Sequence, residues 1–218
     1  MQKSTSLSTN FPNGLYAITD PRLLPTERLI SAVESALRGG ARVIQYRDKT
    51  ASDIELVKNA QSLRDLCADY QARLIINDDL NLCLRINADG LHLGKSDGDI
   101  SHARDKLGDD KLLGVTCHSD LAYAQRCIQH GVDYCAFGRI FPSKTKANAP
   151  HCTLDTLKKA VKLACPSVAI GGITIENAPS ITATNIHSIA AIHGLFGQQD
   201  IEATARIFSS LFQLSKTE

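Results

Sequence analysis

The chain has 218 residues, of which 43% are hydrophobic and 22% are charged, the composition of an ordinary soluble globular protein. A formal net charge of +1, with no run of five like charges, gives no basic field for binding nucleic acid and no acidic tail. No apolar run approaches the roughly 20 residues that a membrane span requires. The length suits a single domain of α/β-barrel size.

The N-terminal residues 1–13 are polar and rich in Ser and Thr, without the apolar core of a signal peptide. We therefore interpret residues 1–13 as an extension and residues 14–218 as one domain. The seven cysteines include no Cys-x-x-Cys spacing, which favours reduced structural thiols over disulfides or a metal site. Together these features predict a cytoplasmic protein.

Eight short apolar runs alternate with amphipathic segments along the chain. The predicted strands are residues 15–19, 43–46, 73–76, 90–93, 113–116, 134–137, 167–170 and 188–192. The clearest predicted helices are residues 26–38, 52–70, 121–130, 154–164 and 201–214. This pattern predicts an α/β fold, a single (β/α)8 TIM barrel. A doubly wound open sheet competes, but it usually has fewer strands and a G-x-G-x-x-G loop, which is missing here.

Active sites in such barrels form at the C-terminal ends of the strands, where several polar clusters of this chain fall. Gln45 and Arg47 share one face of the second strand, and Lys49 lies just beyond it. An amide, a guanidinium fork and an ammonium in line suit a diphosphate. The alternative is that these are ordinary surface charges after a strand. We disfavour it because an arginine at a strand end, flanked by two potential partners, is costly to bury without a function.

Two acidic positions follow the third and fourth strands. Asn77 and Asp78 end an apolar run, and Asp97 lies in the loop after residue 93. Asp78 and Asp97 together suit Mg²⁺, which takes one or two carboxylates plus water and substrate oxygens. Asn77 and Asp78 are alternatively a pair that only forms a turn. Asp99 is an alternative to Asp97 as the metal ligand.

The remaining clusters suit phosphate groups. After the sixth strand, Ser143 and Thr145 alternate with Lys144 and Lys146, so hydroxyls and ammonium groups meet in one loop. Gly171-Gly172 and Ile192-His193 follow the seventh and eighth strands, whose loops often hold phosphate in this fold. Thr116 and His118 end the fifth strand, where acid–base work and simple packing are about equally favoured for the histidine.

Over nearly its whole length the chain resembles the thiamine phosphate synthase family. The segments that carry the resemblance are Gly-Leu-Tyr-Ala-Ile-Thr-Asp at 14–20, Val-Ile-Gln-Tyr-Arg-Asp-Lys at 43–49, Leu-Ile-Ile-Asn-Asp at 74–78, Ala-Asp-Gly-Leu-His-Leu-Gly at 88–94, Leu-Gly-Val-Thr-Cys-His at 113–118, Phe-Gly-Arg-Ile-Phe-Pro-Ser-Lys-Thr-Lys at 137–146 and Val-Ala-Ile-Gly-Gly-Ile at 168–173.

The resemblance implies a Mg²⁺-dependent transferase that joins hydroxymethylpyrimidine diphosphate to thiazole phosphate. It places the pyrimidine diphosphate on Gln45, Arg47, Lys49, Asn77 and Lys146, with Thr116 near the pyrimidine. It places Mg²⁺ on Asp78 and Asp97, and the thiazole phosphate on Ser143, Thr145, Gly172, Ile192 and His193. The residues expected to act in catalysis are Arg47, Lys49, Thr116 and Lys146. The expected partners are thus small molecules, and a homo-oligomer remains open.

Some positions depart from the family pattern. Lys95 and Thr116 replace a usual Gln and Ser, and His193-Gly194-Leu195 replaces a Ser-Ala-Ile motif.

The related thiazole tautomerase shares the fold and relies on a histidine near the fifth strand, where His118 lies, so it is one alternative function. A non-catalytic paralogue that binds a thiamine precursor is another, and a sugar-phosphate isomerase is a third. The intact diphosphate and metal set favours the synthase.

Overall fold

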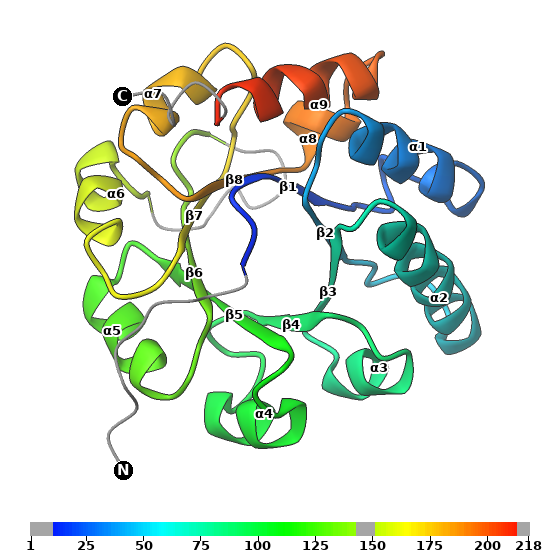
Figure 1. Cartoon of the computed structure of the whole chain (residues 1–218), viewed down its shortest axis with the longest axis horizontal. Helices are drawn as coiled ribbons and strands as arrows, with labels where there is room; N and C mark the ends of the chain where they lie inside the picture. The colour runs from blue at the N-terminus through cyan, green and yellow to red at the C-terminus, as the bar shows by residue number, and fades with distance from the viewer. Residues whose placement is uncertain (1–10, 143–150, 213–218) are drawn as a thin grey trace.

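The computed structural model describes residues 11–142 and 151–212, and its eight parallel strands close into one barrel (Figure 1). Each strand pairs in parallel with the next, and β8 pairs with β1. The strands are β1 (Gly14–Ile18), β2 (Val43–Tyr46), β3 (Arg73–Asn77), β4 (Gly90–Leu93), β5 (Leu112–His118), β6 (Tyr134–Phe137), β7 (Ser167–Ile170) and β8 (Ser188–Ala191). The predicted TIM barrel is confirmed.

Helices form a ring around the outside of the strands (Figure 1). They are α1 (Thr26–Arg38), α2 (Asp53–Asp69), α3 (Leu80–Arg85), α4 (Ile100–Leu107), α5 (Leu121–Gln129), α6 (Leu154–Ala160), α7 (Ala178–Thr182), α8 (His193–Phe196) and α9 (Ile201–Ser210). Several begin at a side-chain cap. Ser52 and Glu55 form a reciprocal capping box at α2, and the carboxylate of Asp200 accepts from the backbone N–H of Ala203 at α9.

The side chains of each strand alternate between two buried layers. Outward-facing residues such as Leu15, Ile44 and Leu74 pack against the helices in the larger core cluster. Inward-facing residues such as Tyr16 and Val168 fill the barrel interior. The period of two along each strand fixes which residues face the interior and hence which ones can line a site at its mouth.

Phe11, which we assigned to the N-terminal extension, is instead part of the interior core. Its side chain is 3% exposed, and its ring stacks on that of Tyr134 with centroids 4.2 Å apart. The carbonyl of Phe11 accepts from His187 Nε2 (3.1 Å), and that of Pro12 accepts from Ser188 Oγ (3.0 Å). In Figure 1 this start of the described chain, in dark blue, lies within the ring of strands.

Some element boundaries differ from the prediction. β5 extends from Leu112 to His118 because a bulge after Thr116 lets the strand continue, whereas we expected residues 113–116. β8 ends at Ala191 rather than at Ile192, because α8 begins immediately afterwards. The short helices α3, α4 and α7 have too few turns to leave a clear helical period in the sequence.

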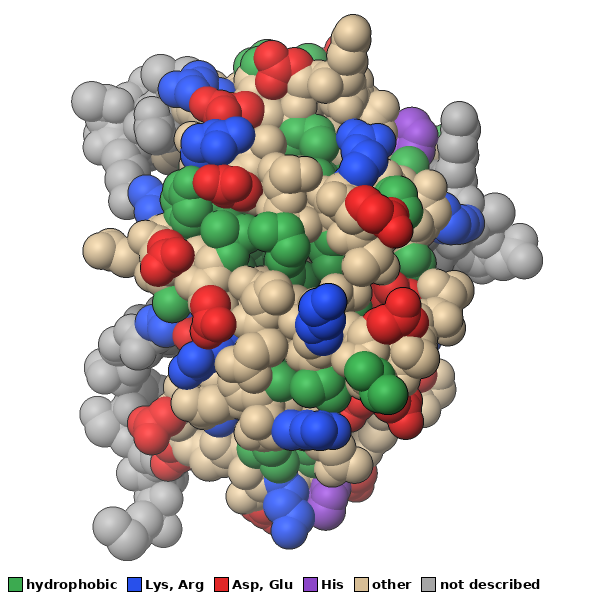
Figure 2. All heavy atoms as spheres, turned by 90° about the vertical axis from the view of Figure 1, so that its right-hand side faces the viewer, with side chains coloured by type: hydrophobic (Ala, Val, Ile, Leu, Met, Phe, Trp, Pro, Cys, Tyr) green, Lys and Arg blue, Asp and Glu red, His purple; other side chains and the backbone are tan. Residues whose placement is uncertain are grey.

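The outer surface carries charges of both signs. Figure 2 shows Lys and Arg interspersed with Asp and Glu over the side of the barrel that α1 and α2 cover in Figure 1. Within the described ranges, no helix is both long and apolar enough to cross a membrane. All seven cysteines are buried and free, as expected for structural thiols.

Replacing Phe11 tests whether it supports the barrel. Phe11→Ala should lower the free energy of unfolding by about 3 kcal/mol, because it removes a buried ring and leaves a cavity against Tyr134. Urea denaturation followed by circular dichroism measures this change. Ile54→Ala, at a side chain 83% exposed on α2, should change it by less than about 0.5 kcal/mol. Equal effects of the two substitutions would contradict the packing role of Phe11.

Candidate active site

A cavity of about 300 Å³ opens at the C-terminal ends of the strands. Every predicted site residue that the structure describes lines it, namely Gln45, Arg47, Lys49, Asn77, Asp78, Asp97, Thr116, Gly172, Ile192 and His193. Ser143, Thr145 and Lys146 lie outside the described residues, so their positions stay predictions. The fold thus brings residues from six strand ends or loops to one place.

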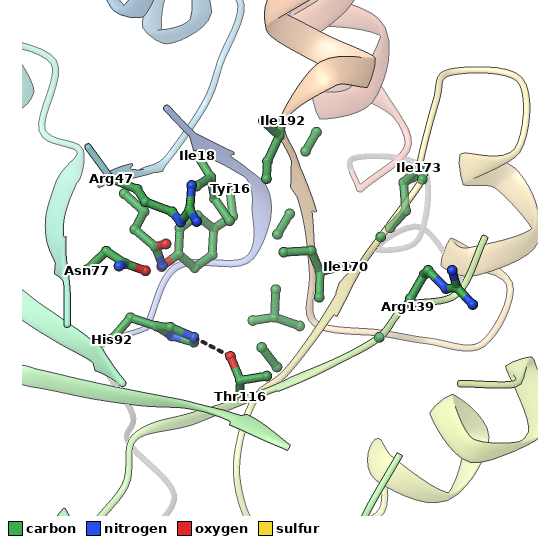
Figure 3. Close-up of a pocket in the computed structure, with 18 of the residues that line it drawn as sticks. Tyr16, Ile18, Arg47, Asn77, His92, Thr116, Arg139, Ile170, Ile173 and Ile192 are labelled. Atoms are coloured by element: carbon green, nitrogen blue, oxygen red, sulfur yellow. Dashed lines mark hydrogen bonds between the residues drawn. The ribbon is translucent and has the colours of Figure 1, made fainter. Parts of the chain in front are cut away.

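The cavity has two chemically different sides. In Figure 3, mostly polar side chains lie along one side (Arg47, Asn77, His92 and Thr116, with Ile18 beside Arg47), and mostly apolar ones along the other (Ile170, Ile173 and Ile192, with Arg139 beyond Ile173). The polar side comes from β2 to β5 and their loops, and the apolar side from β7 and β8 and theirs. This division suits a ligand with a charged or hydrogen-bonding part and an apolar part.

The end of β2 is fixed by the neighbouring strand. Thr19, directly after β1, accepts from the backbone N–H of Arg47 (2.9 Å) and donates to the Arg47 carbonyl (3.2 Å). Gln45 is 3% exposed, and its Nε2 donates to Tyr16 Oη at 2.7 Å. These contacts hold the backbone at Arg47 and one amide hydrogen of Gln45 in place, so the β2 cluster is ordered before a ligand arrives.

Asp78 is the centre of the polar side. Its carboxylate accepts from Asn77 Nδ2 at 2.7 Å and lies 3.1 Å from Lys49 Nζ. The backbone of Asp78 is left-handed, with φ of 62°, a conformation that aspartate tolerates better than most residues. The residues that end β3 and the cation beyond β2 therefore form one connected charged group.

The two acidic candidates in the loop after β4 have different positions. Asp97 lines the cavity, and its carboxylate lies so close over Gly94 that a Cβ at residue 94 would overlap it. Asp99 instead caps α4, because its Oδ1 accepts from the backbone N–H of His102 at 2.7 Å. The geometry therefore assigns Asp97, and not Asp99, to the cavity.

The described residues contain no cluster of three or more His, Cys, Asp or Glu side chains placed to hold a metal. Asp78 and Asp97 are the carboxylates on the cavity wall. A pair of carboxylates fits Mg²⁺, which keeps several waters and completes its shell with substrate oxygens. It does not fit a tetrahedral zinc site with N and S ligands.

The apolar side presents backbone to the cavity. Gly172 has φ of 67°, and a Cβ there would overlap the carbonyl oxygen of Pro142. Ile192 precedes α8, and His193 is the first residue of that helix rather than an extension of strand β8. A Cβ at Gly194 would likewise overlap the carbonyl oxygen of Ile173, so the β7 and β8 loops approach each other closely, and His193 lines the cavity beside them.

The cavity also contains residues that the sequence analysis did not assign to the site. Tyr16, Ile18, His92 and Arg139 line it. His92 Nε2 lies 2.9 Å from Thr116 Oγ1, the hydrogen bond drawn in Figure 3. Two of them could have been found from the sequence, because Tyr16 and His92 lie at inward-facing positions of otherwise apolar strands. A buried polar side chain at such a position needs a hydrogen-bond partner.

Asp20, which falls at the end of β1, does not line the cavity. It is 2% exposed and forms two side-chain hydrogen bonds with Arg22, at 3.0 and 2.7 Å. The hydrogen bond from the Arg22 guanidinium holds the pKa of the Asp20 carboxyl below its usual value, although burial opposes this. Asp20 therefore closes the β1 loop and has no contact with the cavity surface.

Comparisons with known proteins are consistent across sequence and structure. The sequence profile described as "Thiamine monophosphate synthase" matches residues 15–195. The chain is 50% identical over 209 residues to a thiamine-phosphate synthase of Alcanivorax borkumensis, covering 94% of this chain and 96% of that one. It is 47% identical over 199 residues to a thiamine-phosphate synthase of Methylobacillus flagellatus, covering 91% and 95%.

Among solved structures, a thiamine phosphate pyrophosphorylase from Pyrococcus furiosus superposes with a TM-score of 0.85 at 31% identity, covering 93% of this chain and 96% of that one. A 3-hexulose-6-phosphate synthase matches with a TM-score of 0.67 at 16% identity, over 91% of this chain and 99% of that one. The second likeness is one of fold alone.

The Asp20–Arg22 pair predicts a pH-dependent contribution to stability. A carboxyl whose pKa is lowered in the folded state stabilises the protein above its unfolded pKa of about 3.9, and this stabilisation is lost as pH falls through the folded pKa. Arg22→Gln should therefore be less stable than the parent at pH 7, and the difference should be smaller at pH 3. Urea unfolding at both pH values measures it. Arg28→Gln, the same charge change at an exposed position of α1, should show no such trend. A difference for Arg22→Gln that is equal at both pH values would contradict the assignment.

Proposed function

The chain belongs to the thiamine monophosphate synthase family and is a transferase, and we propose that it joins hydroxymethylpyrimidine diphosphate to a thiazole phosphate, forming thiamine phosphate and diphosphate. The observation that carries this proposal is the shared cavity. Those predicted diphosphate ligands that the structure describes, both metal candidates and the β7–β8 backbone all face the same space. A two-substrate transfer needs such an arrangement, because both reactants must meet at one point.

The polar side is suited to the diphosphate. Arg47 offers a planar fork of donors, Lys49 a mobile ammonium, and Asn77 an amide beside Asp78. In the ligand-free arrangement Lys49 is paired with Asp78. An incoming diphosphate competes with this carboxylate for Lys49, which is 57% exposed and has room to turn toward it.

The proposed reaction needs no protein nucleophile. The bond between the pyrimidine methylene carbon and the diphosphate oxygen breaks, and its electron pair leaves with the diphosphate. The resulting cation is stabilised by the pyrimidine ring, and the lone pair of the thiazole nitrogen forms the new carbon–nitrogen bond. Arg47 and Lys49 supply positive charge where the leaving group gains negative charge, which is an electrostatic form of catalysis.

Asp78 and Asp97 are the residues that would hold Mg²⁺, a role supported by their carboxylates on the cavity wall and by the space that Gly94 leaves for Asp97. When bound, the ion would neutralise part of the diphosphate charge and thereby make it a better leaving group. Asp78 also orients Asn77 and Lys49, so its substitution would disturb the diphosphate ligands as well.

The thiazole phosphate is assigned to the opposite side. The backbone at Gly172, together with Ile192 and His193, would surround it. By analogy with the family sequence, Ser143 and Thr145 would complete the pocket, and Lys146 would bind the diphosphate. The ring itself would contact the apolar surface that includes Ile170 and Ile173. His193 replaces a smaller hydroxyl residue of the family, and it offers a ring N–H donor to the phosphate.

A thiazole tautomerase is the alternative that one observation favours, since His118 also lines the cavity. That reaction moves a proton and needs no diphosphate leaving group, so Arg47, Lys49 and the two carboxylates would have no role in it. The test is to incubate the purified protein with both substrates and Mg²⁺, and to identify the product by mass. Thiamine phosphate with an equal amount of diphosphate supports the synthase. Absence of both, with isomerisation of the thiazole phosphate alone, would establish the tautomerase instead.

The metal assignment is tested by a matched pair of substitutions. Asp97→Asn should raise the Mg²⁺ concentration for half-maximal rate by at least about tenfold, because it removes one negative ligand. Asp99→Asn should leave that concentration unchanged, because asparagine caps a helix as well as aspartate does. The rate is measured as diphosphate release against Mg²⁺ concentration. If Asp99→Asn raised that concentration and Asp97→Asn left it unchanged, Asp99 would be the metal ligand instead of Asp97.

A further inference from the structure

Five polar side chains form a continuous hydrogen-bonded chain across the barrel interior. Gln45 Nε2 donates to Tyr16 Oη (2.7 Å), and Tyr16 Oη is 2.9 Å from Tyr134 Oη. Tyr134 Oη is 3.0 Å from His92 Nδ1, and His92 Nε2 is 2.9 Å from Thr116 Oγ1. The chain links strands β2, β1, β6, β4 and β5, and we refer to these five residues as the interior relay.

The two ends of the interior relay line the active-site cavity, whereas Tyr134 does not. Gln45 and Thr116 are on the cavity wall, and so are Tyr16 and His92. Tyr134 is completely buried below them. Its ring is held between Phe11, stacked at 4.2 Å, and His92, at 5.6 Å. Tyr134 therefore connects the packed interior of the barrel around Phe11 to the side chains that line the cavity.

Counting hydrogens gives the interior relay a direction. A tyrosine hydroxyl has one hydrogen to donate. Tyr16 accepts from Gln45, and its other hydrogen-bond partner in the described part of the chain is Tyr134, so Tyr16 donates to Tyr134. In the reverse order Tyr16 would accept from both neighbours, and its own buried hydrogen would lack an acceptor among the described residues.

The direction continues to the cavity. Because Tyr134 accepts from Tyr16, its own hydrogen goes to His92 Nδ1. The imidazole is then neutral, with its proton on Nε2, and this N–H donates to Thr116 Oγ1. The hydrogen of the Thr116 hydroxyl is thereby directed away from His92 and is available to an acceptor atom of a ligand. Burial raises the pKa of Tyr16 and of Tyr134, so both hydroxyls keep their hydrogens over the working pH range.

We propose that Tyr134 is a positioning residue for substrate recognition: through His92 it makes the Thr116 hydroxyl an obligatory hydrogen-bond donor to an acceptor atom of the heteroaromatic substrate. This role rests on the proposed function, in which the pyrimidine lies beside Thr116. The other end of the relay commits one amide hydrogen of Gln45, leaving its carbonyl oxygen as an acceptor. The site then offers a donor and an acceptor in fixed positions, which discriminates between rings with different patterns of nitrogen and amino groups.

Tyr134→Phe removes the hydroxyl while keeping the ring that packs against Phe11. The matched control is Tyr46→Phe, which removes a hydroxyl from a tyrosine 3% exposed in the outer core layer, outside the interior relay. Both variants are first compared with the parent by circular dichroism and urea unfolding. The tautomer of His92 is then measured by ¹⁵N NMR of the imidazole ring in the ligand-free protein, with His92→Gln identifying its signals.

The NMR measurement is independent of catalysis. In the parent and in Tyr46→Phe, Nε2 should carry the proton and Nδ1 should not. In Tyr134→Phe this single tautomer should be lost, since Nδ1 no longer receives a hydrogen bond. A parent with its proton on Nδ1, or a tautomer unchanged by Tyr134→Phe, would overturn the proposal. A parent that makes no thiamine phosphate would refute the proposed function, and the NMR result would still decide the direction of the relay.

Kinetics test the link to the substrate. Tyr134→Phe should lower kcat/KM for the pyrimidine diphosphate by about 3- to 10-fold through a higher KM, the effect of weakening one hydrogen bond. The inhibition constant of inorganic diphosphate with Mg²⁺ should stay within about twofold, because Arg47 and Lys49 are untouched. In the Thr116→Val background, Tyr134→Phe should cause no further loss, since the hydroxyl it directs is gone. Additive losses in the double variant, or an equal loss in Tyr46→Phe, would show that Tyr134 does not act through Thr116.

Discussion

The pairing of β8 with β1 is the contact on which the rest of the structure depends. Gly14 to Ala17 align with Ser188 to Ala191, and this parallel ladder turns a row of strands into a closed barrel. Closure leaves no free sheet edge, and it brings all eight C-terminal strand ends to one mouth. Residues that are far apart in the sequence, such as Arg47 and His193, meet at one cavity only because the ring is complete.

The same closure decides what the interior must contain. Inward positions of a narrow barrel are buried on all sides, so polar side chains there are stable only as partners of one another. Tyr16, Tyr134 and His92 satisfy this requirement together, and Gln45 and Thr116 terminate the network where the interior opens. Packing of the core and arrangement of the site are therefore not separate properties of this barrel, because the same side chains serve both.

The fold and most of the cavity wall could be predicted from the sequence because they depend on local pattern. Short, near-continuous apolar runs specify the strands, and a strand's end specifies where Gln45, Arg47 and Asp78 lie. Asp97 could not be separated from Asp99 in this way, although a cap position directly before Ile100 was the available signal. The roles of these residues, including the metal, remain predictions.

The features that were missed depend on contacts across the barrel. Phe11 looked like part of a polar extension because its partner Tyr134 is more than a hundred residues away, and no local pattern connects them. His92 looked like a polar residue within an apolar strand, and its importance appears only when Tyr134 and Thr116 are placed beside it. The end of β8 was placed one residue late because α8 follows without a loop, so no turn residue marks the boundary.

The contacts of Phe11 and Pro12 with His187 and Ser188 also constrain how the chain reaches its folded state. These hydrogen bonds join positions 176 residues apart. During synthesis the first strand must therefore wait for nearly the whole polypeptide before its final neighbour exists. Such long-range closure slows folding relative to proteins built from local contacts, and it leaves the edges of the early strands exposed to other chains meanwhile. The edge of β1 that will pair with β8 is consequently a place where a nascent chain of this protein can mispair.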